Sequence, residues 1–403
     1  ALKQVVIFDY ASLSNIVINN SISYQEILEN YEAIEIGFER VGFDHPLYIM
    51  YSSGTTGVPK CIVHGHGGTL VQHLKEHQLQ TNISSGDRVF YFTTCSWMMW
   101  NWLVSALGTG ATIMLYDGSP TYPDNTVLWQ FADEEEFSHF GTSAKYIETL
   151  MKDEVNPSAI FKLSNLKVIC STGSPLSAEC YDYIYNNVGY VHLASISGGT
   201  DIVSCFVLGV PNIPVRRGEI QGAGLGMAVE IWDDSGRVNR GERGELVCTK
   251  PFPSRPVKFW NDIDGRKYHA AYFDRFEGVW AHGDFAEQTP DGGYIIYGRS
   301  DATLNPGGVR IGTAEIYRQV DRVKEVLESI VIGQIWESDT RIVLFVKLRE
   351  GINLTETLAD TIKKLIKNNC TSRHVPSKIL QVEDIPRTKS GKIVEIPVRD
   401  IVH

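Results

Sequence analysis

The sequence lacks an excess of positive charge, a pairing pattern for its cysteines, internal repeats and low-complexity segments. Its 37 lysines and arginines are outnumbered by 48 aspartates and glutamates, which gives a net charge of −11 over 403 residues. This balance argues against nucleic acid as the main partner, so any anionic ligand must be met by local cations and helix N-termini. Seven cysteines, an odd number without paired spacing, are typical of reduced thiols in a cytoplasmic protein.

Signals for membrane insertion or export are also absent. The first residues, Ala-Leu-Lys-Gln-Val-Val, do not form the apolar core of a signal peptide. No charged residue occurs between Arg88 and Asp117, but polar side chains are scattered through that segment and Gly108 and Gly110 interrupt it. The segment therefore predicts a buried helix leading into a strand at Ala111–Tyr116, and no membrane insertion is expected.

The chain is long enough for two or three domains, and its first part predicts an α/β fold. Short β-rich runs alternate with helical runs from residue 46 to about 205, which indicates a doubly wound, mostly parallel sheet. The predicted helices are Gly68–Gln80 and Ala178–Asn187. The predicted strands are Leu47–Tyr51, Ala111–Tyr116, Leu166–Ser171, Val191–Ile196 and Ile202–Gly209.

In the second part of the chain, the predicted pattern of secondary structure changes twice. Short strands separated by Gly, Pro and Asp turns predict an antiparallel β subdomain, with strands at Met227–Asp233, Gly244–Thr249 and Gly293–Tyr297. After Gly298-Arg-Ser-Asp301 we expect a small α+β domain over residues 299–403, following a large domain over residues 1–298. Its predicted helices are Thr313 to about Ser329 and one carrying Leu354, Leu358, Ile362 and Leu365 on one face.

The densest polar motif is Tyr51-Ser-Ser-Gly-Thr-Thr-Gly-Val-Pro-Lys60. Its glycines permit close backbone approach, its hydroxyls donate hydrogen bonds and Lys60 adds a mobile charge, so we expect it to wrap a polyphosphate. It is not a Walker loop, because Pro59 precedes the lysine and the Gly-Lys-Ser/Thr ending is missing. The alternative is an ordinary polar turn after an apolar strand at Pro46–Met50.

Further polar clusters follow strand ends at wide spacing. Ligands of open α/β sheets bind at the carboxyl ends of parallel strands, so these clusters are expected to converge. Each alone is compatible with a simple turn. They are Phe140-Gly-Thr-Ser-Ala-Lys-Tyr146, Ser171-Thr-Gly-Ser-Pro175, Ser197-Gly-Gly-Thr-Asp201, His282-Gly-Asp284, Tyr297–Tyr317 and Pro386-Arg-Thr-Lys-Ser-Gly-Lys392.

In this order, the motifs resemble those of the adenylate-forming superfamily, which includes acyl-CoA synthetases. The segments Tyr297–Tyr317, Ser195–Ser204 and Lys250-Pro-Phe-Pro253 look most like the members that activate acetoacetate. The resemblance implies two steps: acetoacetate and ATP give an acyl-adenylate and pyrophosphate, and coenzyme A then displaces AMP. Only about fifty residues precede the phosphate loop, so we expect part of the large domain to be missing.

The resemblance assigns phosphate and metal contacts to residues of two motifs. Ser52, Ser53, Gly54, Thr55, Thr56, Gly57 and Lys60 hold the β- and γ-phosphates of ATP. Thr200 bonds the α-phosphate, and Asp201 binds Mg²⁺, an ion that prefers carboxylate, phosphate and water oxygens. The superfamily usually has Glu at the position of Asp201, so coordination through water is expected. A helix N-cap is the alternative role for Asp201.

Other motifs correspond to the nucleoside and the catalytic lysine. Gly173, Ser174 and Pro175 match the segment that frames adenine. Asp284 matches the carboxylate that binds the two ribose hydroxyls, and Arg299 adds a ribose or phosphate contact; a plain salt bridge between them is the alternative. Lys392 matches the lysine that bridges the attacking carboxylate and the α-phosphate, with a solvated basic tail as the alternative.

The resemblance also implies a mobile small domain and a coenzyme A site. Asp301 matches the hinge about which the small domain rotates between the half-reactions, since two different sites must be assembled in turn. Gly308 and Arg310 match positions near the coenzyme A tunnel.

The acid pocket is expected to involve Gly198, Thr172, Trp97 and Met98. Acetate-specific relatives close this pocket with a Trp at the position that aligns with Gly198. A glycine there opens room for a longer acid such as acetoacetate, and another short-chain acid is the alternative substrate.

Two rival functions stay open. The segment His73-Leu-Lys-Glu-His77 fits the His-x-x-Glu-His pattern of some zinc hydrolases, in which two imidazoles share a helical face. Buried polar helix residues are the simpler explanation of that match. A catalytically impaired adenylate-binding fragment is the second rival, and the oligomeric state is not indicated by any motif.

Overall fold

The computed structural model describes residues 3–10, 18–52, 59–337, 339–388 and 392–403. It divides into two compact units, residues 1–42 and residues 43–403, which are considered separately. The first unit contains two short parallel strands, β1 (Val5–Ile7) and β2 (Ser21–Ser23), and helix α1 (Tyr24–Asn30). Ser23 caps this helix, because its hydroxyl accepts the Glu26 N–H at 3.0 Å.

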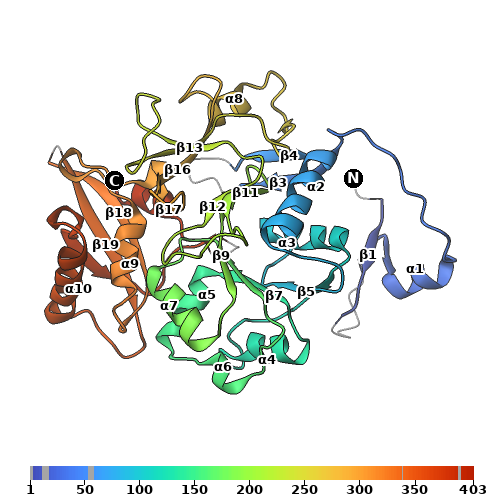
Figure 1. Cartoon of the computed structure of the whole chain (residues 1–403), viewed down its shortest axis with the longest axis horizontal. Helices are drawn as coiled ribbons and strands as arrows, with labels where there is room; N and C mark the ends of the chain where they lie inside the picture. Colours follow the sequence, from blue (N-terminus) through green and yellow to red (C-terminus); the bar gives the residue numbers. More distant parts are fainter. Residues whose placement is uncertain (1–2, 11–17, 53–58, 338, 389–391) are drawn as a thin grey trace. The chain divides into compact units, whose positions relative to one another are not determined.

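The centre of the second unit is a sheet of five parallel strands in the order β6-β5-β7-β8-β9 (Figure 1). Successive residues along these strands point to opposite faces: Ile169 joins one core cluster and its neighbours Val168 and Cys170 join another. The predicted α/β class is therefore confirmed. The strands are β5 (Arg88–Tyr91), β6 (Thr112–Met114), β7 (His139–Ser143), β8 (Val168–Thr172) and β9 (His192–Ser195).

Helices cover both faces of this sheet. On one face, Met99, Trp102 and Leu103 of α3 (Met98–Ser105) pack into the core cluster that contains Val168. The other face is covered by α4 (Val127–Glu134), α5 (Ala144–Lys152) and α7 (Ala178–Asn187). The short α6 (Pro157–Ile160) lies between α5 and α7 in the chain. The predicted buried helix before the strand at 112–114 and the predicted helix Ala178–Asn187 are both confirmed.

Two strands expected in the parallel sheet pair elsewhere. β3 (Pro46–Tyr51) forms a hairpin with β4 (Cys61–Gly65), which also pairs with β15 (Lys258–Phe259). β11 (Ser204–Leu208) lies antiparallel between β10 (Ser197–Gly199) and β12 (Gly222–Ala223). The prediction of parallel pairing was wrong for both, because a parallel neighbour requires a crossover of about a dozen or more residues. Nine residues separate β3 from β4 and four separate β10 from β11, which is too few for a crossover.

The antiparallel subdomain is confirmed as a four-stranded sheet in the order β13-β14-β16-β17. Helix α8 (Arg266–Tyr272) precedes β16 and packs on its first residues through the ring of Tyr272. The strands are β13 (Val229–Trp232), β14 (Arg243–Cys248), β16 (Trp280–Gln288) and β17 (Tyr294–Arg299).

The C-terminal part has its own sheet, β18-β19-β20, and its own core. The helix predicted from Thr313 to Ser329 was wrong in its second half: α9 spans Thr313–Val320, and Val326–Trp336 forms strand β18. Val326, Ile330, Val331 and Ile332 supply the β-branched residues that favour a strand. The other elements are β19 (Asp339–Leu348), β20 (Lys378–Gln381), α10 (Glu356–Asn369), which carries the second predicted helix, and α11 (Glu395–Val402).

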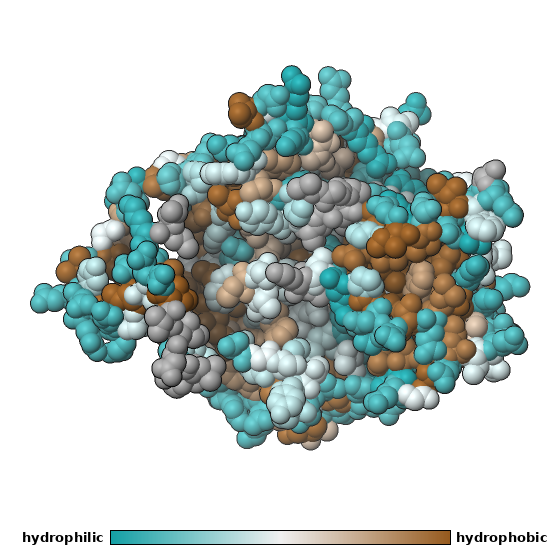
Figure 2. Space-filling view, turned by 180° about the vertical axis from the view of Figure 1, so that it is seen from behind, coloured by the Kyte–Doolittle hydropathy of each residue, from teal (hydrophilic) through white to brown (hydrophobic). Residues whose placement is uncertain are grey.

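No helix in the described parts of the chain has both the length and the apolar character needed to cross a bilayer. Viewed from behind, hydrophobic surface gathers on the side that carries β18 and β19 (Figure 2). The exposed large hydrophobic side chains of that C-terminal part are Ile335, Trp336, Leu380 and Ile401.

Candidate functional site

The predicted phosphate loop connects the two strands of the β3–β4 hairpin. Its ends are tied together, because Ser52 N–H donates to the Lys60 carbonyl at 3.0 Å and Lys60 N–H donates to Ser52 Oγ at 3.2 Å. This pairing fixes where the Lys60 side chain begins. The predicted contacts of Ser53, Gly54, Thr55, Thr56 and Gly57 lie outside the described residues.

Lys60 reaches Asp201, a residue 141 positions away in the sequence. Lys60 Nζ lies 2.5 Å from Asp201 Oδ1, and the Tyr272 hydroxyl donates to the same oxygen at 2.5 Å. Burial alone would raise the pKa of Asp201, but the charge of Lys60 and the bonds from Lys60 and Tyr272 hold it below its usual range. The structure thus brings the predicted phosphate lysine and the predicted metal carboxylate into direct contact.

Tyr272 was not predicted to belong to the site. Its ring stacks on Trp280 with centroids 3.7 Å apart, and Lys60 Nζ lies 5.0 Å from the Tyr272 ring centroid. Burial and the neighbouring carboxylate of Asp201 raise the pKa of Tyr272, so its hydroxyl stays protonated and donates. No motif surrounds this tyrosine in the sequence, and only the packing of α8 on β16 reveals its place.

The turn that carries Thr200 and Asp201 is held by a buried histidine of β4. His64 Nε2 donates to the Thr200 carbonyl at 2.8 Å. Burial lowers the pKa of His64 to about 4, against the opposing effect of this hydrogen bond. The imidazole is therefore neutral at physiological pH and serves as a donor to the turn. The predicted contact of the Thr200 side chain with an α-phosphate stays a prediction.

Asp284 and Arg299 face each other across the β16–β17 pair. Arg299 Nη1 donates to Asp284 Oδ1 at 3.0 Å and to the His282 carbonyl at 3.1 Å. His282 Nε2 lies 3.8 Å from the other oxygen of Asp284. The salt bridge weighed as the alternative role is therefore present, and the predicted binding of ribose stays a prediction.

The two groups adjoin through Gly199. A Cβ at Gly199 would lie 3.4 Å from the His282 ring and 3.6 Å from Asp201 Oδ2, so a side chain there would fill the space between them. Lys60, Asp201, His282, Asp284 and Arg299 thus form one continuous polar cluster, contributed by the residue before β4, by β16 and β17, and by the turn after β10. These residues of separate motifs come together, but His282, Asp284 and Arg299 lie within antiparallel strands and not at the carboxyl ends of the parallel sheet as expected.

The predicted adenine segment and acid pocket lie at the end of β8. Thr172 Oγ1 donates to the Ile196 carbonyl at 2.8 Å, and Gly173 takes a positive φ of 95°. The Trp97 ring lies 3.6 Å from where a Cβ of Gly173 would be, so Trp97, Thr172 and Gly173 are neighbours. Ser174 is exposed, Pro175 is half-buried and Met98 is buried in the core beneath Trp97. Their roles toward a ligand stay predictions.

The backbone geometry at Gly198 differs from that of an open pocket wall. A Cβ at this position would lie 2.1 Å from the Ser204 carbonyl oxygen and 2.4 Å from Cys205 Cα. The close pairing of β10 with β11 therefore requires glycine here. Replacing Gly198 by Trp would displace β11, so Trp97 offers a cleaner test of the acid pocket.

Lys392, Gly308 and Arg310 do not join this cluster in the described structure, whereas Asp301 lies 3.7 Å from Arg299 Nε. Lys392 is exposed; its N–H donates to Thr388 Oγ1 at 3.1 Å and its charge acts on Glu395. Gly308 is exposed with a φ of 75°, and a Cβ there would meet nothing within 4 Å. Arg310 folds back onto the segment after β17, where Nη2 donates to the Ser300 carbonyl at 3.1 Å.

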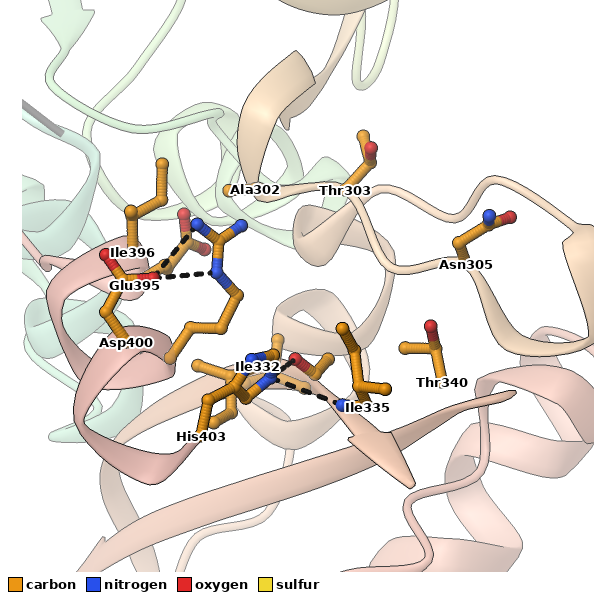
Figure 3. Close-up of a pocket in the computed structure, with 13 residues that line it drawn as sticks. Ala302, Thr303, Asn305, Ile332, Ile335, Thr340, Glu395, Ile396, Asp400 and His403 are labelled. Atoms are coloured by element: carbon orange, nitrogen blue, oxygen red, sulfur yellow. Dashed lines mark hydrogen bonds and ion pairs between the residues drawn. The ribbon is translucent and has the colours of Figure 1, made fainter. Parts of the chain in front are cut away.

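A pocket of about 370 Å³ lies in the C-terminal part, between β18, α11 and the segment after Asp301 (Figure 3). Ile332 and Ile335 come from β18, and Glu395, Ile396 and Asp400 come from α11. None of the predicted site residues lines it. Arg399, which does, already donates to the Asp301 carbonyl at 3.0 Å and pairs with Asp400 at 3.1 Å.

The histidines of the zinc-like segment have structural partners. The segment runs from α2 (His66–Lys75) into a π-helical turn (Glu76–Gln80). His73 Nε2 donates to the Val203 carbonyl at 2.5 Å, and His77 Nε2 donates to the Trp102 carbonyl at 2.9 Å. Glu76 accepts from the Trp102 indole at 3.0 Å. Within the described ranges, no three His, Cys, Asp or Glu side chains are placed to share a metal ion. These contacts favour the interpretation of His73, Glu76 and His77 as buried polar helix residues over a zinc site.

The cluster offers a magnesium ion one protein carboxylate and no complete set of protein ligands. Asp201 contributes a single carboxylate, and its Oδ1 is already shared by Lys60 and Tyr272. Mg²⁺ keeps several waters and is usually bound by one or two carboxylates together with substrate phosphates. The donor set therefore suits an ion that arrives with a polyphosphate, not an all-protein cage.

Comparisons with known proteins agree with the resemblance. The AMP-binding enzyme family matches residues 11–255, and the AMP-binding enzyme C-terminal domain matches residues 316–392. The acetoacetyl-coenzyme A synthetase of Rhizobium meliloti (strain 1021) is 60% identical over 396 residues, which cover 98% of this chain and 61% of that protein. The Gallus gallus acetoacetyl-CoA synthetase is 48% identical over 411 residues, covering 100% of this chain and 62% of the relative.

A solved structure shares the fold. The acetoacetyl-CoA synthetase from Streptomyces lividans superposes with a TM-score of 0.91 at 43% identity, covering 100% of this chain and 61% of that one. The chain thus spans about three fifths of the length of the relatives it matches.

Proposed function

Because the chain belongs to the AMP-binding enzyme family, we propose that it is an acid–thiol ligase that couples acetoacetate to coenzyme A at the expense of ATP. The observation that carries the proposal is the continuous cluster of Lys60, Asp201, His282, Asp284 and Arg299. Its members lie next to one another, which supports the proposal that Lys60 meets phosphates, Asp201 a metal and Asp284 the ribose. The similarity to acetoacetyl-CoA synthetases supports acetoacetate as the acid.

In the first step, a carboxylate oxygen of acetoacetate attacks the α-phosphorus of ATP, and pyrophosphate leaves with the electron pair of the broken P–O bond. Lys60 exchanges Asp201 for the phosphate oxygens, and Asp201 would then hold the ion that arrives with the nucleotide. Mg²⁺, when bound, neutralises charge on the phosphates. Thr200 donates to the α-phosphate, and the turn that carries it is held by His64.

The nucleoside is held at the other end of the cluster. Asp284 accepts from the two ribose hydroxyls, since an ionised carboxylate offers several lone pairs. Arg299 keeps Asp284 in position through its bond at 3.0 Å. Gly173, Ser174 and Pro175 frame the adenine, and Gly173 gives the chain the positive φ that turns it away from β8.

In the second step, the thiol sulfur of coenzyme A attacks the acyl carbon, its proton passes to solvent, and AMP leaves with the electrons of the acyl–oxygen bond. Gly308 and Arg310 contact coenzyme A, and Thr172 and Trp97 lie beside the acyl group. Lys392 acts in the first step, bridging the attacking carboxylate and the α-phosphate.

A rotation about Asp301 brings Lys392 and then Gly308 to the nucleotide in turn. The contacts that hold the C-terminal part in its present place suit a reversible interface, because many of them are polar. Lys145 Nζ and Lys152 Nζ of α5 donate to the carbonyls of Leu327 and Val326 at 3.1 and 3.2 Å. Lys152 also lies 3.6 Å from Asp321.

Two alternatives follow from specific observations. The chain spans about three fifths of its relatives' length, so an adenylate-binding chain without turnover is the second candidate. Another short-chain acid is the alternative substrate.

The test combines binding and turnover in one panel. The chain is supplied with MgATP, with and without coenzyme A, and with acetoacetate, acetate, propanoate, butanoate or hexanoate. We expect acetoacetate to give the fastest exchange of labelled pyrophosphate into ATP and the fastest AMP release. A different preferred acid would reassign the substrate. Saturable ATP binding without exchange for any acid would favour the binding protein, and no ATP binding at all would refute both.

A further inference from the structure

Glu245 is a buried acid that none of the roles above uses. It lies in β14, where its side chain is 1% exposed and its neighbours Leu246 and Val247 belong to the apolar core. Burial raises the pKa of Glu245, and the bonds from Ser300 and Arg275 only partly oppose that effect. A carboxylate in such a place requires partners that satisfy both of its oxygens.

One oxygen of Glu245 holds the backbone beside the ribose carboxylate. Gly283 N–H donates to Glu245 Oε1 at 2.8 Å, and Gly283 stands between His282 and Asp284. Gly283 has a φ of 83°, and a Cβ there would lie 2.5 Å from Arg299 Nη2. Because Gly283 has no side chain, the Arg299 guanidinium can lie against its backbone, while the N–H of Gly283 points at Glu245.

The other oxygen of Glu245 holds the segment that leads into the predicted hinge. Ser300 Oγ donates to Glu245 Oε2 at 2.5 Å, and Ser300 stands between Arg299 and Asp301. The Ser300 carbonyl in turn accepts from Arg310 Nη2 at 3.1 Å. One carboxylate therefore joins the strand that carries Asp284 to the segment on which the C-terminal part turns.

Arg275 extends this network on the outer side. Arg275 Nη1 lies 2.5 Å from Glu245 Oε2, and Nη2 lies 2.8 Å from Asp234. Arg310 Nη1 reaches the same aspartate at 3.5 Å. Arg310 is thus tied to the hinge segment through Ser300 and to Arg275 through Asp234, so movement of the hinge alters the surroundings of a residue predicted to contact coenzyme A.

We infer that Glu245 is a positioning residue that couples occupation of the ribose site to the placement of the C-terminal part. Through Gly283 it sets the backbone of Asp284, and through Ser300 it sets the start of the hinge. A ribose that bonds to Asp284 restrains the first of these contacts and, through the shared carboxylate, the second. The inference rests on the proposed function, since it takes Asp284 as the ribose ligand and Asp301 as the hinge.

Three variants separate this role from simple structural support. Glu245→Gln keeps the shape but removes the charge. Ser300→Ala removes only the contact between Glu245 and the hinge. The buried charge of Glu245 keeps Arg275 as its partner in this variant. Glu230→Gln is the control, because Glu230 lies in the same sheet and accepts the Trp232 indole N–H at 2.7 Å without touching Gly283 or Ser300.

The first readout does not depend on turnover. Hydrogen exchange of peptides covering residues 296–312 is followed by mass spectrometry with and without AMP. We expect AMP to slow exchange of this segment at least threefold in the wild type and in Glu230→Gln, and to leave it unchanged in Glu245→Gln and Ser300→Ala. Isothermal titration should show a roughly tenfold weaker Kd for AMP in Glu245→Gln and an unaltered Kd in Ser300→Ala.

The second readout compares the half-reactions. We expect Glu245→Gln and Ser300→Ala to change the ratio of pyrophosphate exchange to coenzyme A-dependent AMP release at least fivefold, whereas a purely structural loss lowers both rates together. Equal AMP protection of residues 296–312 in all four proteins would overturn the inference. A wild type that binds AMP but turns over no acid would instead overturn the proposed function, and the exchange experiment would still decide the role of Glu245.

Discussion

Replacing Asp201 by Asn tests the site at its most connected residue. The aspartate side chain is 17% exposed and its Oδ1 receives both Lys60 and Tyr272 at 2.5 Å. Asparagine has nearly the same size and keeps one oxygen acceptor, so packing is preserved while the charge is lost. The substitution leaves Lys60, which is 32% exposed, without its anion.

The magnitude of the stability loss follows from these two bonds. A hydrogen bond to a charged group contributes about 1.5–3 kcal/mol and a neutral one about 1 kcal/mol, so each bond loses on the order of 1 kcal/mol. Lys60 regains water when its partner is removed, which limits the loss. We expect Asp201→Asn to lower the free energy of unfolding by about 2 kcal/mol, measured by urea denaturation without nucleotide.

The effect on activity should exceed the effect on stability. If Asp201 is the protein's carboxylate on Mg²⁺, its removal should raise the magnesium concentration for half-maximal pyrophosphate exchange at least tenfold, equivalent to about 1.4 kcal/mol. The matched control is Asp87→Asn, because Asp87 is buried, pairs with Lys167 at 2.7 Å and lies outside the cluster. The reasoning is refuted if both variants show the same magnesium requirement as the wild type.

Three further predictions test other parts of the structure. Arg299→Gln leaves Asp284, which is 9% exposed, without its cation. We therefore expect the free energy of unfolding in urea to fall by about 3 kcal/mol and the KM for ATP to rise at least tenfold. An unchanged KM would contradict the assignment of Asp284 to the ribose. Burial, followed by the charge of Asp321, raises the pKa of Glu148 from 4.5 to about 7. The contribution of protonated Glu148 to the free energy of unfolding is therefore full below about pH 4.5 and is lost as the pH rises through 7. At about 1.4 kcal/mol per unit, the effect is at most about 3 kcal/mol, and urea midpoints at pH 5.5 and 8 should show it in the wild type but not in Glu148→Gln. Trp97→Leu widens the space beside Gly173 and should raise the ratio of hexanoate to acetoacetate kcat/KM at least tenfold, whereas the exposed Trp260→Leu should not; equal ratios would remove Trp97 from the pocket.

The order of elements was predictable from the sequence where local signals agree with the final packing. Helix α7 was predicted at Ala178–Asn187, its observed bounds, because a polar start and an apolar face occur together. The segment after Val320 misled, since Val323 and Leu327 continue a helical spacing while the β-branched run that follows pairs with β19. Periodicity alone does not reveal that a partner strand, β19, follows directly after the turn at the end of β18.

The site was predictable where motifs carry its residues. Lys60, Asp201, Asp284 and Arg299 were each chosen from motifs, and the structure joins them. Tyr272 was missed because it reaches Asp201 only through the packing of α8.

Glu245 left a usable signal, since an acid inside an apolar strand, Gly-Glu-Leu-Val-Cys, requires buried partners. The identity of those partners depends on strand pairing over tens of residues, which no local pattern records.

The central claim is that the strand-end residues and Lys60 hold one nucleotide between them. A crystal structure of the chain with bound AMP tests this most directly. We predict the phosphate within hydrogen-bonding distance of Thr200 and the ribose hydroxyls on Asp284, with the adenine beside Gly173. AMP bound in the pocket between β18 and α11, or with its ribose away from Asp284, would contradict the account.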